Sequence, residues 1–117
     1  MSGKENTLVK RKVVSDLLYG DENYIREFAV ATEESFKEFS VNYRKYLLKR
    51  DETNFRKAGH KIKPAAQMLH LDPIVDEYEH AKQLLWDEES TQQQLEKSVE
   101  RIEQLCEQII DDLREMQ

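Results

Sequence analysis

Glycine, proline and cysteine are scarce in this chain. Its 117 residues include three glycines, two prolines and one cysteine. Folds built from strands and turns need more glycine and proline than this to punctuate the chain, so the scarcity argues against a strand-rich fold. The single cysteine, Cys106, cannot form an internal disulfide. It falls among apolar residues at helical spacing, which predicts a small buried hydrophobic side chain.

Long apolar runs and a basic charge balance are missing as well. No run of about 18 apolar residues occurs, so the sequence predicts no membrane span. The amino terminus has no apolar secretory segment, and we therefore expect a cytoplasmic protein. The net charge of −6 argues against a nucleic-acid binder, which would normally show a basic face. No glycine-rich phosphate loop is present, which argues against a nucleotide site and a kinase activity of the chain's own.

Apolar residues instead recur every three or four positions along most of the chain. This is the spacing of amphipathic helices, and it predicts an all-α protein. The length predicts a single domain over residues 1–117, with residues 1–7 disordered. The expected helices cover about residues 8–19, 21–49, 51–69, 72–85 and 90–116.

Residues that favour helix ends stand between these segments. Gly20 can end the first helix in the left-handed conformation. The expected N-caps are Asp21, Asp51, Asp72 (followed by Pro73 at the first helical position) and either Ser90 or Thr91. Short connections favour antiparallel neighbours. We therefore expect an antiparallel up-down-up-down four-helix bundle, with the short N-terminal helix covering one end.

The third predicted helix carries two neighbouring stripes of different character. Its apolar stripe consists of Phe55, Gly59, Ile62, Ala66 and Leu69. The polar stripe beside it consists of Arg56, His60, Lys63 and Gln67. The imidazole of His60 should therefore face water, one helical turn from the ammonium group of Lys63. A neutral exposed imidazole beside a fixed cation suits a group that accepts a phosphoryl group and gives it up again.

The segment 59–66, Gly-His-Lys-Ile-Lys-Pro-Ala-Ala, resembles the motif of the histidine-containing phosphotransfer (HPt) domain family, approximately Ala-His-x-Leu-Lys-Gly-Ser-Ser. His60 matches the phosphoacceptor and Lys63 the lysine one turn later. The family's apolar and small positions are matched by Ile62, Ala65, Ala66 and Leu69. The resemblance covers about residues 10–85. The chain departs from the pattern at Pro64, where the family usually has glycine, at Gly59, where alanine is common, and at His70, near another frequent glycine.

The resemblance implies a two-component phosphorelay, in which His60 takes a phosphoryl group from a phosphoaspartate and passes it to another receiver. It implies that Lys63 stabilises the phosphate, and that the partner docks on Arg56, Lys61, Pro64 and Gln67. The partners would be receiver domains of response regulators or hybrid histidine kinases. We expect no cofactor of the chain's own, since the receiver would bring Mg²⁺. We also expect a monomer that contacts neither nucleic acid nor membrane.

Two other interpretations stay open. A histidine on a helix is most often a plain surface residue, so the chain could be a degenerate HPt-like or other helical bundle that only binds proteins. Glu77 and His80 have the Glu-x-x-His spacing of a bundle metal site, although no second such pair occurs. The acidic pairs Glu88–Glu89 and Asp111–Asp112 are expected to be solvated.

Overall fold

The computed structural model describes residues 7–117, so most of the predicted N-terminal disorder, residues 1–6, lies outside the described residues. The described residues form five helices and no strand, which confirms the all-α class. The helices are α1 (Arg11–Leu17), α2 (Glu22–Leu48), α3 (Glu52–Met68), α4 (Asp72–Trp86) and α5 (Gln92–Arg114). α3 continues through Pro64 to Met68 as one helix.

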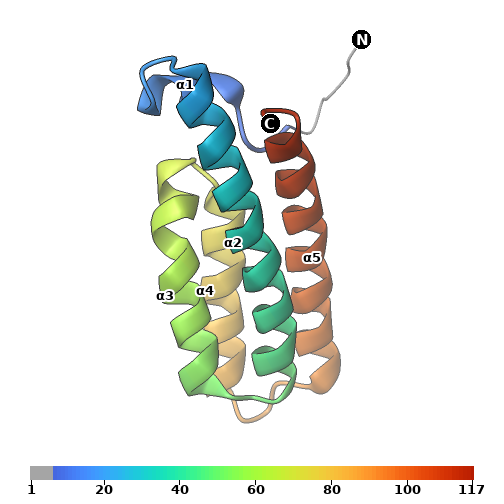
Figure 1. Cartoon of the computed structure of the whole chain (residues 1–117). Coiled ribbons are helices and arrows are strands. Elements are labelled where there is room, and N and C mark those ends of the chain that lie inside the picture. The colour runs from blue at the N-terminus through green and yellow to red at the C-terminus, as the bar shows by residue number, and fades with distance from the viewer. Residues whose placement is uncertain (1–6) are drawn as a thin grey trace.

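The four longer helices lie side by side as a bundle (Figure 1). α2 packs against α3 and α5, and α4 packs against the same two helices. α1 lies at one end of the bundle, beside the start of α2 (Figure 1). Within residues 7–117, no helix combines the length and the apolar character that crossing a bilayer requires. The arrangement turns one face of α3 outward, between α2 and α4.

A row of aromatic rings joins α2, α3 and α4 through the core. The ring centroids of Phe39 and Tyr43 lie 5.4 Å apart, those of Tyr43 and Phe55 4.9 Å, and those of Phe55 and Tyr78 5.2 Å. The first two pairs meet edge to face, an arrangement that aromatic quadrupoles favour. Cys106 is also buried, as predicted, and its burial raises the pKa of the thiol to about 12.

Side-chain caps begin three of the helices. Asp21 accepts hydrogen bonds from the backbone amides of Asn23 and Tyr24, as predicted, and Asp51 accepts one from Asn54. Thr91 rather than Ser90 caps α5, in a capping box with Gln94. The predicted cap Asp72 is wrong, because the N-cap of α4 is Leu71 and Asp72 is already helical. The connection after α3 is so short that the buried Leu71 occupies the cap position itself.

α2 and α3 end in the Schellman geometry, in which two backbone amides turn back to the last carbonyls, and α1 ends with the outer of these two bonds. In α1, α2 and α3 the closing amides are those of Gly20, Asp51 and Leu71, which donate to the carbonyls of Ser15, Tyr46 and Ala66. The left-handed residues just past the helices are Tyr19, Arg50 and His70, with φ between 55° and 58°. The prediction for Gly20 is therefore incomplete: Gly20 also has positive φ, but Tyr19 occupies the position that glycine favours.

Two buried carboxylates hold the chain ends against the bundle. Asp112 accepts hydrogen bonds from the amides of Leu8 (2.7 Å) and Val9 (2.9 Å). The prediction that Asp112 is solvated is wrong, since it is 3% exposed. These bonds satisfy the two amides without a helical turn, which explains why α1 begins only at Arg11 and not near Leu8.

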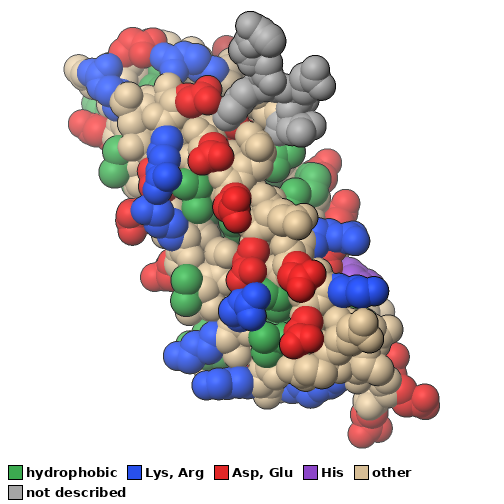
Figure 2. Space-filling view, turned by 90° about the vertical axis from the view of Figure 1, so that its right-hand side faces the viewer, with side chains coloured by type: hydrophobic (Ala, Val, Ile, Leu, Met, Phe, Trp, Pro, Cys, Tyr) green, Lys and Arg blue, Asp and Glu red, His purple; other side chains and the backbone are tan. Residues whose placement is uncertain are grey.

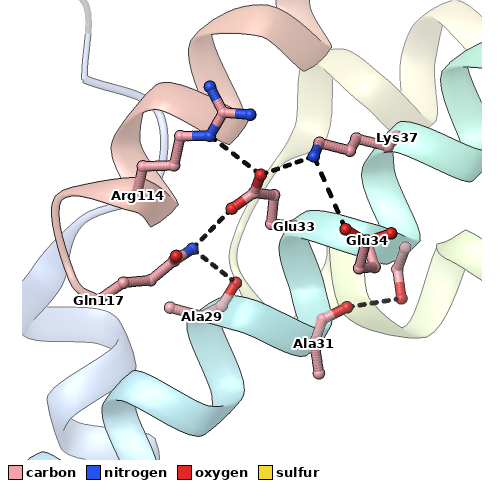
Figure 3. Close-up of polar contacts among 8 residues, drawn as sticks. Ala29, Ala31, Glu33, Glu34, Lys37, Arg114 and Gln117 are labelled. Atoms are coloured by element: carbon pink, nitrogen blue, oxygen red, sulfur yellow. Dashed lines mark hydrogen bonds and ion pairs between the residues drawn. The ribbon is translucent and has the colours of Figure 1, made fainter.

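The second carboxylate, Glu33 on α2, anchors the C-terminal segment. It accepts hydrogen bonds from Arg114 Nε (2.9 Å) and Gln117 Nε2 (2.7 Å), and pairs with Lys37 at 2.9 Å (Figure 3). The hydrogen bonds from Gln117 and Lys37 are the main reasons why the pKa of Glu33 falls to about 2. Glu33 is therefore ionised at neutral pH, where it joins α2 to the end of α5.

Candidate functional site

His60 lies midway along α3, on the face that packs against no other helix. Its side chain is exposed, whereas the predicted apolar stripe beside it is buried throughout: Phe55, Gly59, Ile62, Ala66 and Leu69. The two stripes therefore separate as the helical spacing predicts. The phosphoacceptor role of His60 stays a prediction.

An ion pair stands on either side of His60. On the α2 side, Lys61 Nζ lies 2.5 Å from Glu38 Oε1. On the α4 side, Lys63 Nζ lies 3.6 Å from Glu79 Oε2, and the Lys63 side chain is 38% exposed. Both lysines therefore reach away from His60 toward acidic residues on the flanking helices. Lys63 lies close to the predicted site, but its ammonium group already has an anionic partner.

The turn of α3 that carries His60 rests on Tyr78 of α4. A Cβ atom at Gly59 would lie 2.0 Å from Tyr78 Cζ, so only glycine leaves room for the ring. The Tyr78 hydroxyl donates a 3.3 Å hydrogen bond to the carbonyl oxygen of Arg56. Alanine, which is common at this position of the HPt motif, would therefore fit at Gly59 only if the Tyr78 ring moved. Gly59 and Tyr78 set how closely α4 approaches the residue before His60.

The remaining predicted docking residues line the same outward face. Arg56, Lys61, Pro64 and Gln67 are all exposed. Because proline has no amide hydrogen, Pro64 cannot donate to the carbonyl oxygen of His60, which leaves that oxygen free of its usual helical bond. The structure thus brings all six predicted site residues to one face of α3. Their roles stay predictions.

Charge is unevenly distributed between α3 and α5. The outward face of α3 presents Arg56, Lys57 and Lys61 around His60. On α5, acidic side chains run along the exposed face (Figure 2), and the exposed acidic residues of this helix include Glu96, Glu100, Glu107 and Asp111. Since α3 and α5 each pack against α2 and α4, their outer faces point away from each other. The outward face of α3 is therefore more basic than that of α5.

The Glu-x-x-His pair on α4 takes part in different interactions. His80 is exposed, but Glu77 is buried and its Oε2 accepts a 2.7 Å hydrogen bond from Ser98. Ser98 in turn shares a 2.7 Å hydrogen bond with the Tyr43 hydroxyl, and Arg101 lies 3.4 Å from Glu77. Among residues 7–117, no three His, Cys, Asp or Glu residues are placed to hold a metal ion. Glu77 instead joins α2, α4 and α5 through buried hydrogen bonds.

The buried positions of Glu33, Glu77 and Asp112 were not predicted, although the sequence contains a signal for them. Glu33, Glu77 and Asp112 all lie three or four positions from buried apolar residues on their own helices. Carboxylates at such positions are predicted to face the core, where they need hydrogen-bond donors. Their donors come from distant segments, which the spacing does not reveal. No comparable spacing in the sequence indicates the contact between Gly59 and Tyr78.

No family model matches this chain, and searches of curated proteins and of solved structures likewise give no match.

Proposed function

We propose that this chain is a histidine phosphotransfer protein, and that His60 is its phosphoacceptor. The observation that carries the proposal is the exposed imidazole midway along α3, with Lys61 and Lys63 beside it. The resemblance of residues 59–66 to the HPt motif supplies the reaction. The cationic residues around His60 would attract the acidic pocket of a phosphorylated receiver.

The transfer is a displacement at phosphorus. A lone pair on a ring nitrogen of neutral His60 attacks the phosphoryl group of the receiver's phosphoaspartate, forming an N–P bond. The acyl phosphate P–O bond breaks, and the aspartate leaves as a carboxylate. The other ring nitrogen gives its proton to solvent, and a second receiver reverses the step. Lys63 stabilises the phosphoryl oxygens, and Mg²⁺ comes with the receiver, so that the chain needs no cofactor of its own.

The proposal includes an architecture and a setting. The four longer helices form an antiparallel up-down-up-down bundle of the HPt type, and α1 covers one end. The short connections between consecutive helices support this arrangement. The protein acts as a cytoplasmic monomer, binding receiver domains and neither nucleic acid nor membrane. The docking surface consists of Arg56, Lys61, Pro64 and Gln67, all of which lie on the face that bears His60.

A second function is a protein-interaction module without phosphotransfer. Two observations favour it: Pro64 occupies the position where the HPt motif has glycine, and Lys63 is already paired with Glu79. Such a module would bind receivers through the same face of α3. It would bind them equally well when His60 is replaced by alanine, and it would never carry a phosphoryl group.

The deciding experiment offers the protein a set of receiver domains carrying labelled phosphoaspartate. Wild type should gain acid-labile label, and His60→Gln should gain none. His80→Gln is the matched control, because His80 is another exposed helical histidine and should leave labelling unchanged. Lys63→Ala should slow transfer while the melting temperature stays nearly constant. Label that persists in His60→Gln refutes the proposal, and a large fall in melting temperature in Lys63→Ala would assign Lys63 a structural role.

A further inference from the structure

The carboxylate of Glu79 lies between two lysines that come from different helices. Its Oε2 lies 3.6 Å from Lys63 Nζ on α3, and its Oε1 lies 3.0 Å from Lys82 Nζ on α4. Each oxygen therefore has its own cation. Lys63 is one of them, although it stands one helical turn from His60 and is expected to serve a phosphate there.

The two lysines are not equivalent partners of Glu79. The Lys82 side chain is only 20% exposed, and its ammonium group also lies 5.1 Å from the centre of the Tyr78 ring. The Lys63 side chain is 38% exposed and its contact with Glu79 is longer. The hydrogen bond from Lys82 is the largest cause of the lowered pKa of Glu79, and Lys63 contributes less. Glu79 would thus keep an ionised carboxylate and a close cation if Lys63 moved away.

From this asymmetry we infer that Glu79 is a positioning residue, which holds Lys63 while His60 is unphosphorylated and releases it to the phosphoryl group once His60 is phosphorylated. The inference rests on the proposed function. A phosphoryl group carries more negative charge than a carboxylate and has three acceptor oxygens, so it competes well for Lys63. The exchange moves an ion pair and makes no covalent bond, and Lys82 remains with Glu79 throughout.

The exchange has a measurable consequence. The free energy needed to separate Lys63 from Glu79 offsets part of the attraction between Lys63 and the phosphoryl group. An exposed ion pair of this kind changes an equilibrium by about two- to fivefold. Replacing Glu79 by glutamine should therefore strengthen the contact between Lys63 and the phosphoryl group by about that factor. A stronger contact with an ammonium group disfavours protonation of the phosphoryl oxygens.

The experiment loads His60 with phosphoramidate, which needs no partner protein, and follows the titration of the phosphoryl group by phosphorus NMR. In Glu79→Gln the proton affinity of the phosphoryl group should fall by about two- to fivefold relative to wild type. In a Lys63→Ala background the same substitution should have no effect. Glu103→Gln is the matched control, because it breaks the exposed Arg44–Glu103 pair between α2 and α5 (2.7 Å) and should leave the titration unchanged.

The possible outcomes separate this inference from the proposed function. A titration that is unchanged in Glu79→Gln, or an effect that persists without Lys63, refutes the role of Glu79 while His60 still accepts phosphate. Failure of phosphoramidate to label His60 refutes both proposals. If phosphoramidate labels His60 and the Glu79 effect is present but no receiver exchanges the group, the phosphorelay is refuted and the role of Glu79 is upheld. Circular dichroism of each variant verifies that the bundle is folded.

Discussion

Replacing Gly59 by alanine tests how α4 supports the helical turn that carries His60. A Cβ atom there would lie 2.0 Å from Tyr78 Cζ, 2.2 Å from Cε1 and 2.4 Å from the hydroxyl oxygen. Carbon atoms in contact are normally about 3.5–4.0 Å apart, so the ring would have to move by roughly 1.5 Å. Its space is limited by Phe55, whose ring centroid lies 5.2 Å away. The hydrogen bond from Tyr78 to the Arg56 carbonyl would be strained or lost.

The net effect of Gly59→Ala is the sum of opposing contributions. Overpacking of this kind costs about 1–3 kcal/mol, and the lost hydrogen bond costs about 1 kcal/mol more. Alanine stabilises a helix interior by about 1 kcal/mol relative to glycine. We therefore expect the free energy of unfolding to fall by about 1–3 kcal/mol. For a chain of this length, 1 kcal/mol corresponds to about 4 °C in melting temperature.

The assay is thermal unfolding followed by far-ultraviolet circular dichroism, with Tyr78→Leu as a second background. Leucine lacks all three Tyr78 atoms that the new Cβ would meet. In that background Gly59→Ala should be neutral or stabilising by up to about 1 kcal/mol, because only the gain in helix propensity remains. An increase in melting temperature when Gly59→Ala is made in wild type would refute the reasoning, and so would an equal loss in both backgrounds.

Three further predictions concern the ends of the bundle. Because the pKa of Glu33 is lowered to about 2 from its ordinary value of 4.5, its stabilising effect is complete above about pH 4.5 and is lost as the pH falls toward 2. The difference in melting temperature between wild type and Glu33→Gln should narrow over that range, and a constant difference would contradict this assignment. Asp112→Ala should lower the free energy of unfolding by about 1.5–3 kcal/mol and speed hydrogen exchange at the amides of Leu8 and Val9. The control is Asp111→Ala, which replaces an exposed neighbour and should change the free energy of unfolding by less than about 0.5 kcal/mol. Tyr19→Gly and His70→Gly should each raise the free energy of unfolding by about 0.5–1 kcal/mol, because glycine adopts the left-handed backbone conformation without strain. Denaturant unfolding measures this change. An unchanged or lower free energy of unfolding would argue that these turns are not strained.

Local patterns in the sequence were sufficient to predict the helices and the exposed position of His60. Amphipathic spacing depends only on residues three and four positions apart, and such residues share a helix face whatever the rest of the chain does. The buried and exposed stripes of α3 follow directly from it. Asp21 and Asp51 act as predicted caps for the same reason, because a cap bonds to amides only two or three positions away.

Local patterns failed where a side chain meets a distant segment. Asp112 is three residues from the buried Ile109 of α5, but its partners, Leu8 and Val9, lie more than a hundred positions away. The N-cap of α4 was misplaced because the buried Leu71 closes α3 and starts α4 at once. The fit of Tyr78 against Gly59 depends on how closely α3 and α4 approach, which no spacing within one helix determines.

The amino-acid sequence by itself determined that this chain is helical, where most of its helices lie, and that an imidazole and a lysine share an outward face of α3. Those properties arise from interactions within one or two helical turns. Only the tertiary structure decided which partners surround that face: Tyr78 against Gly59, Glu79 beside Lys63, and Glu38 beside Lys61. Each of these contacts joins two helices, so it exists only once packing has brought their faces together.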